Sequence, residues 1–344
     1  MSHHYASHKH GKAAAKLPNL PTGRVVEIGG VSLSRSPVVL LAYNRPELTR
    51  RVLDVVEQAR PGKLYVVCDG PVPHDVDDKI RVSETRALFA DVAWKCEVVR
   101  IYSDHNLGLK KRIVSGLTEV FTTTDRAVIL EDDCVPDLTF FDYCDELLAR
   151  YSLSSDVGII SGASRLRGHA ISSHSYDFSE DLRIWGWATW GRTWNAFVTS
   201  GDVDARWSAG EQQDIVQSLP AGARRKNMRT MLRKAAELDS WALPFAVHFR
   251  KSGYVSAVPA VNLVENVGFG EGSTHTRFED YVAEVPASAM PLPLVHPETT
   301  EAHPHLDALE SQLDRRERWV YPLRHPIDAF RRFFRFGIDM LRTQ

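Results

Sequence analysis

PVVLLAYNRP, residues 37–46, decides the fold of this chain, because an apolar run stops abruptly and a helical pattern follows. The run has the length of a buried strand, and it ends at Asn44. Asn44 and Glu47 have the spacing of a capping box, and Pro46 favours a first helical turn. Apolar residues then recur at helical spacing up to residue 56. The stretch predicts a strand, a tight loop and a helix.

The same pattern returns three times before residue 131. The stretches KLYVVCDGP at 63–71, CEVVRIYSDHN at 96–106 and AVIL at 127–130 predict strands, and amphipathic segments at 76–90 and 109–121 predict helices between them. Strands that alternate with helices predict an α/β fold with a mainly parallel central sheet and helices on both faces. In such sheets ligands bind outside the carboxyl ends of the strands, so the loops after each apolar run are the place to look for a site.

Composition narrows the class of protein. The chain has 344 residues, of which 43% are hydrophobic and 25% charged, and its net charge of -2 gives no reason to expect nucleic acid as a partner. Four cysteines without a CxxC pair suit a reducing compartment. No segment has the apolar length of a membrane span or of a signal peptide core. We therefore expect a cytoplasmic protein.

Three parts can be distinguished along the chain. Residues 1–35 contain a polar, His-rich tail and VVEIGGVSL, which predicts a short hairpin. Residues 36–280 contain the strand and helix pattern, which changes after residue 140 to a helix, a strand near 157, an aromatic stretch, a basic helix and a strand near 254. Residues 281–344 predict an irregular connector rich in proline, then a basic amphipathic helix at 326–342.

AVILEDDCVPD, residues 127–137, places three consecutive carboxylates directly after a buried strand. Glu131, Asp132 and Asp133 repel one another, and a divalent cation would offset that repulsion. Carboxylate oxygens are the ligands that Mg²⁺ and Mn²⁺ prefer, and such an ion can bridge a diphosphate. The alternative is a solvated acidic turn before Pro136. The motif by itself does not separate the two interpretations.

The other strand ends add cations and polar groups. Lys110, Lys111 and Arg112 fall in the expected first turn of a helix, where the dipole favours anions and where phosphate often binds. These side chains can also simply face water. Arg45 and Asp69 follow two earlier strands, and they could hold the polar edge of a nucleoside or cap helices and turns.

The ordered set of motifs resembles a known family. AYNRP, VCDGP, NLGLKKRIVSGL and VILEDDCVPD are similar to the nucleotide-sugar-binding half of GT-A-fold glycosyltransferases. The EDD triplet resembles the metal motif of the N-acetylglucosaminyltransferase I-like enzymes and their bacterial relatives. The resemblance continues through IWGWATWGRTW, LDSWALPF and NLVENVGFGEGSTHT, and so covers residues 36–278. It implies a GT-A fold and a nucleotide-diphospho-sugar donor.

The resemblance also implies roles for individual residues. Asp133 would bind the Mn²⁺ or Mg²⁺ cofactor, Asp132 would face the ribose and Glu131 the donor sugar. The base, expected to be uracil, and the diphosphate would be approached by residues from the earlier strand ends and from a Gly-rich loop that closes over the metal. These donor-binding residues are Arg45, Asp69, Asn106, Lys110, Arg112 and His275.

Asp239 is the candidate catalytic base. An inverting transfer needs one carboxylate that takes the proton of the acceptor hydroxyl as its oxygen attacks the anomeric carbon. In the enzymes that this chain resembles, an acid just before a tryptophan has that role, and here Asp239 precedes Trp241. The alternative is an exposed acid at a helix start, and Asp181 is the reserve candidate.

Aromatic residues and the C-terminus point to the acceptor. Four tryptophans lie within residues 185–194, and we expect one or two, Trp185 and Trp187, to line the acceptor side while the others fill the core. The basic amphipathic helix at 326–342 could lie on an anionic membrane, or it could pack on the domain or on a second subunit.

Together these patterns predict a metal-dependent, inverting glycosyltransferase that moves a sugar from a UDP-linked donor to a hydroxyl of a glycan, glycolipid or protein. Two alternatives remain at this stage. A sugar-phosphate nucleotidyltransferase shares the sheet and the metal, although it usually has a Gly-rich phosphate loop where this chain has AYNRPE. A non-catalytic nucleotide- or sugar-binding protein would have the same fold and would not consume the donor.

Overall fold

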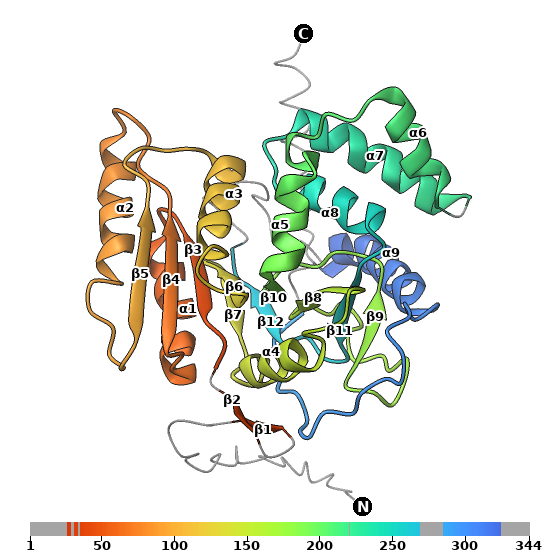
Figure 1. Cartoon of the computed structure of the whole chain (residues 1–344), viewed down its shortest axis with the longest axis horizontal. Helices are drawn as coiled ribbons and strands as arrows, with labels where there is room; N and C mark the ends of the chain where they lie inside the picture. The colour runs from red at the N-terminus through yellow and green to blue at the C-terminus, as the bar shows by residue number, and fades with distance from the viewer. Residues whose placement is uncertain (1–25, 29–30, 34, 220, 269–284, 325–344) are drawn as a thin grey trace, which may run out of the picture.

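The computed structural model describes residues 26–28, 31–33, 35–219, 221–268 and 285–324. Its centre is an eight-stranded sheet with the strand order β5-β4-β3-β6-β10-β8-β11-β9. Figure 1 shows the N-terminal strands and their helices on one side of the molecule and the C-terminal elements on the other. The sheet is therefore the element that both halves share.

The N-terminal half is a parallel sheet built as the periodicity predicts. Strands alternate with helices in the order β3 (Val38–Ala42), α1 (Pro46–Ala59), β4 (Lys63–Cys68), α2 (Val76–Ala87), β5 (Glu97–Tyr102), α3 (Leu109–Val120) and β6 (Arg126–Glu131). β3 pairs in parallel with both β4 and β6, and β4 with β5. The carboxyl ends of all four strands consequently lie along one edge.

The C-terminal half extends the same sheet with mixed directions. β10 (Trp187–Trp190) lies between β6 and β8 (Val157–Ser161) and is antiparallel to both. β11 (Val255–Pro259) is parallel to β8, and β9 (Tyr176–Ser179) closes the edge antiparallel to β11. Four of the seven strand pairings are parallel. The predicted α/β class with a mainly parallel sheet is confirmed.

Both faces of the sheet are covered, because alternate residues of the buried strands enter different apolar clusters. Val38 and Leu40 of β3 pack with α1 and with α4 (Thr139–Arg150), whereas Val39 and Leu41 pack with α3, α5 (Gly191–Thr199) and α8 (Ala242–Lys251). All four side chains are at most 6% exposed. The period-2 burial of one strand thus accounts for the two helical layers.

A small helical lobe packs against the second layer. It contains a 3-10 helix, η1 (Asp202–Asp204), together with α6 (Ala209–Gln217) and α7 (Ala223–Glu237), and its own apolar cluster includes Trp207 and Leu232. α8 joins the two cores, because Phe245 belongs to the cluster beneath the sheet and Val247 to that of the lobe. The lobe holds the end of α7, and with it Asp239, beside the sheet.

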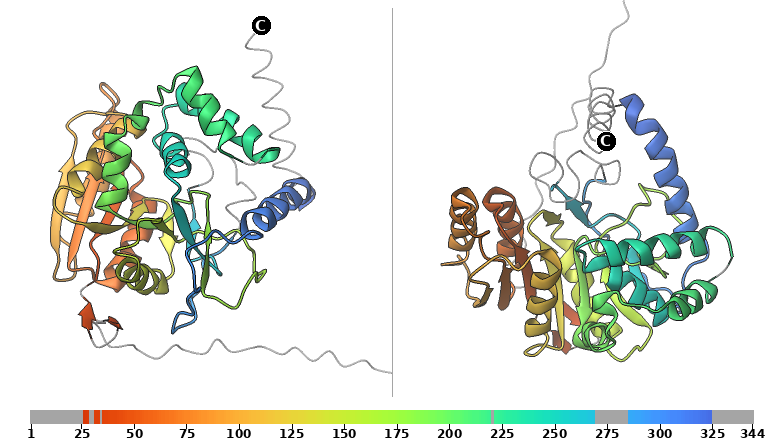
Figure 2. Two further views of the ribbon diagram at one scale, coloured as in Figure 1. Left: turned by 45° about the vertical axis from the view of Figure 1, so that its right-hand side comes forward. Right: turned by 90° about the horizontal axis from the view of Figure 1, so that it is seen from above.

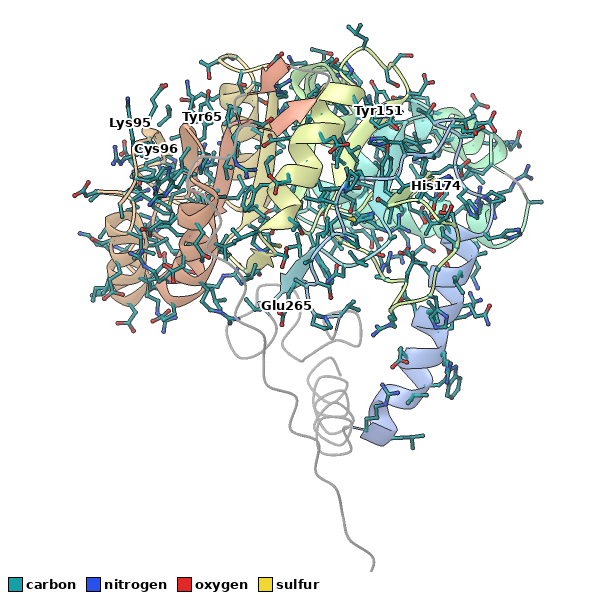
Figure 3. All side chains as sticks on the ribbon, turned by 90° about the horizontal axis from the view of Figure 1, so that it is seen from below. Tyr65, Lys95, Cys96, Tyr151, His174 and Glu265 are labelled. Carbon is teal, nitrogen blue, oxygen red and sulfur yellow. The ribbon has the colours of Figure 1, made fainter. Side chains whose placement is uncertain are left out.

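A two-stranded sheet carries the acidic turn. β7 (Cys134–Pro136) pairs antiparallel with β12 (Val264–Asn266). Figure 3 labels Glu265 on β12, at the margin of the folded body. Because β7 follows Asp133 directly, this pairing fixes the position of the three carboxylates.

Helix α9 (Leu306–Arg324) was not expected from the sequence. It extends from the body beyond the β9 edge (Figures 2 and 3). Arg183, 5% exposed, attaches it through ion pairs with Glu310 and with Asp307, the latter at 3.2 Å. The segment before it contains no helix or strand at residues 285–305. The helix predicted at 326–342 lies outside the described residues.

The structure tests two local predictions, the N-terminal hairpin and the cap of helix α1. The hairpin is present as β1 (Val26–Ile28) paired antiparallel with β2 (Val31–Leu33). The capping box at α1 is wrong: Arg45 is the N-cap, no side chain caps the helix, and the Asn44 amide donates to Asp78 instead. Pro46 does stand in the first turn. Asn44 is drawn away because Asp78 offers it a buried acceptor.

Candidate functional site

A cavity of about 600 Å³ opens at the carboxyl ends of β3, β4 and β6. This is the edge of the sheet at which the sequence pattern predicts a ligand site. The cavity also reaches the start of α3 and the segment between α7 and α8. Its lining residues are Leu41, Ala42, Tyr43, Asn44, Arg45, Val67, Asp69, Val72, Asn106, Gly108, Leu109, Arg112, Ile113, Glu131, Asp132 and Asp239.

Most of the predicted site residues meet at this cavity, although they come from five separate regions of the chain. Arg45, Asp69, Asn106, Arg112, Glu131, Asp132 and Asp239 all line it. Asp133 is not part of the lining but adjoins Asp132. Lys110 is half-buried outside the lining, and His275 lies outside the described residues.

The acidic turn is neutralised in part by Arg45. The Nη1 group of Arg45 donates to Asp133 Oδ2 at 2.9 Å, while Nε donates to Asp132 Oδ2 at 3.4 Å and Nη2 to Asp132 Oδ1. Asp132 is 3% exposed and Asp133 8%. Burial lowers the pKa of Arg45, but the two aspartates outweigh it and the pKa is raised. Arg45, expected near a nucleobase, is thus directed at the acids.

Two carboxyl groups in this turn, those of Glu131 and Asp132, are harder to ionise than usual. Burial raises the pKa of Glu131 to about 8, and the charges of Asp133 and Asp132 contribute to the shift. Burial also raises the pKa of Asp132 to about 6, although Arg45 acts in the opposite direction. Buried acids close to one another resist ionisation unless a cation neutralises them. The turn would therefore gain from a further positive charge.

The donor set fits a divalent cation that brings some of its own ligands. Within the part of the chain that the structure describes, no three His, Cys, Asp or Glu side chains converge as a ready-made metal cage. Mg²⁺ commonly needs only one or two carboxylates when phosphate oxygens and water complete its shell. The cavity wall has an acidic excess that suits such an ion, with two guanidinium groups, Arg45 and Arg112, and four carboxyl groups, Asp69, Glu131, Asp132 and Asp239.

Arg112 is a buried cation that faces the cavity. It is 7% exposed, and its Nε group has no hydrogen-bond partner among the described residues. Burial lowers the pKa of Arg112, and the charges of Asp69 and Glu119 only partly compensate. Gly116 makes room for it, because a Cβ there would lie 2.8 Å from Arg112 Nη2. A buried guanidinium without a bonded carboxylate is suited to an anionic ligand.

Asp69 holds the wall of the cavity through backbone groups. Its carboxylate accepts from the amides of Leu107 and Gly108 at 3.0 to 3.1 Å, and from its own neighbour Gly70 at 2.9 Å. Asn106 Oδ1 also accepts from the Gly108 amide, at 3.1 Å. Gly108 has a φ of 81°, a conformation that favours glycine. Asp69 therefore positions the start of α3, the structural role that the sequence left open for it.

Asp78 is a residue of the site that the sequence did not reveal. It is 7% exposed and accepts three hydrogen bonds, from Tyr43 Oη at 2.6 Å, Asn44 Nδ2 at 2.5 Å and the Val72 amide at 2.7 Å. All three donors line the cavity. Burial raises the pKa of Asp78, but these donors outweigh it and the pKa is lowered. An acid in the first turn of a helix is common, so no local pattern marks it.

Asp239 reaches the cavity from the second half of the chain. It is exposed, and its Oδ2 atom would lie 3.2 Å from a Cβ placed on Gly108. The carboxylate therefore lies against the start of α3, open to both the cavity and solvent. Asp181, the reserve candidate, is not part of the lining and forms an ion pair with Arg250. Of the two acids, only Asp239 has access to a ligand in the cavity.

The expectation that Trp187 lines an acceptor side is wrong. Trp187 is fully buried and stacks on Trp241 with ring centroids 5.9 Å apart. It stands on β10, a central strand covered on both faces, so its ring is enclosed by the helical layer. Trp185 precedes a turn at Gly186, which has a φ of 59°, and is half-buried beside a small separate cavity with Arg165. Trp185 stays a candidate.

The chain after β12 passes directly beside the acidic turn. The Val267 amide donates to the Asp133 carbonyl at 2.8 Å, and a Cβ on Gly268 would lie 2.0 Å from Asp133 Oδ2. Only glycine fits so close an approach. Residues 269–284 follow and are not described. The stretch that the resemblance assigns to a closing loop thus begins next to the proposed metal ligand.

Two observations concern the cysteines and the possibility of a membrane-spanning helix. All four cysteines are free thiols, at positions 68, 96, 134 and 144. Within the described ranges, no helix has the length and apolar character needed to cross a membrane.

Comparison with known proteins leaves the family open. No protein-family model and no curated protein matches this sequence. Among solved structures, HddC from Yersinia pseudotuberculosis complexed with GMP-PN is 12% identical, with 46% of this chain and 77% of that chain covered and a TM-score of 0.27. The 4-diphosphocytidyl-2C-methyl-D-erythritolsynthase from Anaerococcus prevotii is 9% identical, with coverage of 52% and 82% and a TM-score of 0.33.

A third solved structure, a UDP-glucose pyrophosphorylase complexed with UDP-glucose, is 8% identical, with coverage of 64% and 90% and a TM-score of 0.30. The roles of individual residues in this chain therefore rest on the geometry of its own cavity.

Proposed function

We propose that this chain is a metal-dependent, inverting glycosyltransferase with a GT-A-type fold. Its donor would be a nucleotide-diphospho-sugar, with UDP as the expected nucleotide. Its acceptor would be a hydroxyl group of a glycan, a glycolipid or a protein. The residues of the acidic turn, together with Arg112 and Asp239, carry the proposal.

One observation supports this proposal above the others. A single cavity brings together Glu131 and Asp132 at the end of β6, Arg112 on α3 and Asp239 from more than a hundred residues later. The Nε group of Arg112 has no hydrogen-bond partner among the described residues. A sugar transfer from a nucleoside diphosphate needs a cation site, an anion partner for the phosphates and a base for the acceptor. The proposed function uses all three features, and a simple capped acidic turn uses none.

Each group at the cavity would have a separate role in the transfer. Arg112 would pair with a phosphate oxygen, which would give its buried guanidinium an anionic partner. Asp239 would accept the proton of the acceptor hydroxyl while that oxygen attacks the anomeric carbon from the solvent side. Tyr43, Asn44 and Val72, held by Asp78, would form the wall for the nucleoside. Attack opposite the departing diphosphate gives inversion.

Asp133 would be the direct protein ligand of Mn²⁺ or Mg²⁺, and Asp132 and Glu131 would face the ribose and the donor sugar. When bound, the ion stabilises the negative charge of the departing nucleoside diphosphate. The chain at Gly268 lies directly against the Asp133 carboxylate, so any side chain at position 268 would displace that carboxylate. Lys110 and His275 would complete the contacts with the diphosphate.

The proposed acceptor side lies near Trp185. Trp185 would offer a ring for a sugar face, and Asn262 and Asn266 lie beside the same small cavity. The basic segment 326–342 would hold the enzyme at the inner face of the cell membrane, where lipid-linked acceptors are available. A cytoplasmic enzyme in envelope polysaccharide biosynthesis would fit both features.

The decisive experiment incubates the purified chain with Mn²⁺ and UDP-, GDP- or dTDP-sugars, with and without a membrane extract as acceptor source. Acceptor-dependent release of the nucleoside diphosphate from one donor is the expected result. Consumption of a sugar phosphate and a nucleotide with release of pyrophosphate would instead identify a nucleotidyltransferase. Nucleotide binding without consumption of any donor would identify a binding protein.

A further inference from the structure

Arg45 has a position that the proposed reaction does not use. Its guanidinium forms all its described hydrogen bonds with the acidic turn: two with Asp132 and one with Asp133. It stands at the N-cap of α1, so its stem is held by a rigid element. The side chain is 25% exposed, and it lines the cavity together with Asp132, one of the two acids that it binds.

This arrangement gives the aspartates a counter-charge within the chain. Two adjacent carboxylates that are 3% and 8% exposed need a cation nearby, because burial penalises isolated charges. A planar guanidinium that bridges both is well matched to this task, and an ammonium would bind only as a point charge. The turn can therefore fold without a metal ion.

A divalent cation would compete with that guanidinium. An ion bound to Asp133 Oδ2 at about 2.1 Å would lie no more than about 5 Å from Arg45 Nη1, which already donates to the same oxygen at 2.9 Å. Two cations so close repel one another, and they claim the same lone pairs. Metal binding and the Arg45 ion pairs therefore oppose each other.

We propose that Arg45 is a built-in counter-ion of Asp132 and Asp133 that a divalent cation must displace, so that metal binds tightly only together with a diphosphate. The phosphate oxygens would supply ligands to the metal and would give the displaced guanidinium a new anionic partner. Arg45 is then a positioning residue that makes metal binding depend on the donor. This inference rests on the metal dependence of the proposed function.

The test measures Mn²⁺ binding directly by electron paramagnetic resonance, with and without saturating UDP. In the wild type we expect weak binding of Mn²⁺ alone and tight binding with UDP. Arg45→Gln should bind Mn²⁺ alone about tenfold more tightly, since one charge-assisted interaction is removed from competition. Arg45→Lys, which keeps the charge, should stay close to the wild type.

Arg35→Gln is the matched control. Arg35 also bridges two carboxylates, with Asp142 at 2.9 Å and Asp145 at 3.3 Å, but it does not line the cavity. Its substitution should leave Mn²⁺ affinity unchanged. Arg45→Met, which keeps the length of the side chain, serves as a second neutral variant, and thermal melting verifies that each variant is folded.

Two results would overturn the inference in different ways. If Arg45→Gln and Arg45→Met bind Mn²⁺ no better than the wild type while Asp133→Asn abolishes binding, Arg45 is not a competitor and the proposed metal site stands. If the wild type does not bind Mn²⁺ even with UDP, the metal dependence itself fails and the counter-ion role fails with it.

Discussion

Single carboxylates at the cavity join segments that are distant in the sequence. Asp78 on α2 holds Tyr43 and Asn44 from the loop after β3 and also the amide of Val72 after β4. Asp69, which follows β4, accepts hydrogen bonds from the amides of Leu107 and Gly108 and so holds the start of α3. Because each carboxylate accepts several donors, one substitution at either position would leave several polar groups unpaired.

Asp78→Asn should therefore weaken nucleotide binding more than it slows turnover. An asparagine cannot accept the bonds of Tyr43, Asn44 and Val72 together, and we expect a loss of about 1–3 kcal/mol in the free energy of unfolding. UDP affinity by calorimetry and the separate effects on KM and kcat are the measurements. Asp77→Asn, an exposed neighbour in the same turn, is the control. Unchanged UDP affinity in Asp78→Asn would remove Asp78 from the site.

Asp239→Asn should strongly slow transfer and leave nucleotide binding intact. The carboxylate is at the cavity mouth and bonds to none of the nucleotide-facing groups, so its loss affects only proton transfer from the acceptor. A general base contributes about 10²- to 10⁴-fold to the rate, and a decrease of that size in kcat is expected. Glu237→Gln, an exposed acid two residues earlier, should keep full activity. Normal turnover by Asp239→Asn would exclude it as the base.

At the scale of elements, α8 connects the helical lobe with the sheet. His248 on α8 is 5% exposed and bonds through Nδ1 to Asp202 Oδ2 of η1 at 2.7 Å. Asp202 also accepts from Trp207 Nε1 at 2.7 Å and from Lys251 Nζ at 3.0 Å. A buried polar cluster thus helps to attach the lobe that places Asp239, and this contribution should depend on pH.

Stability should fall between pH 7 and pH 5 because of His248. Burial lowers the pKa of His248, and Asp202 only partly compensates. The unfolded chain therefore binds the proton more readily, and the free energy of unfolding decreases as pH falls below the ordinary histidine value of about 6.5.

Asp202 does not contribute to the change in the free energy of unfolding between pH 7 and pH 5. Burial raises its pKa, but its donors outweigh burial and the pKa is about 2, so its stabilising effect is lost only below the ordinary aspartate value. Urea unfolding at both pH values, compared with His248→Gln, isolates the histidine. Parallel losses in the two proteins would contradict this account.

At the scale of the whole molecule, the cavity lies where the two halves of the fold meet. Its lining extends from Leu41 on β3 to Asp239 after α7. The parallel half supplies the nucleotide-facing loops and the acidic turn, and the lobe supplies the exposed acid. A ligand that fills this cavity would contact both halves and would stabilise their arrangement.

UDP and Mn²⁺ together should therefore raise the melting temperature. Ligand at about 100 times its Kd stabilises a protein by about 2.7 kcal/mol. Differential scanning fluorimetry with UDP alone, Mn²⁺ alone and both should show the largest shift for the pair, and EDTA should reverse it. Asp133→Asn should respond to UDP without the additional effect of Mn²⁺. An equal effect of Mn²⁺ on Asp133→Asn and the wild type would argue against a metal at this residue.

Local sequence pattern determined the architecture of the first half. The apolar runs of 37–42 and 127–130 are continuous because strands covered on both faces need apolar residues on each side. The same pattern located the ends of the strands, and with them Arg45 and the acidic turn at one edge. These features could be predicted because hydrophobic period and strand direction are local properties.

The tertiary structure alone decided how these residues meet. Arg45 pairs with Asp132 and Asp133 because β3 and β6 are neighbours, and Asp78 captures Asn44 because α2 returns beside that loop. Trp187 is buried because β10 enters the centre of the sheet. Asp239 reaches the cavity because the lobe folds back toward α3. Each contact forms because segments that are distant in the sequence pack together. A local pattern of residues does not predict which distant segments pack against each other.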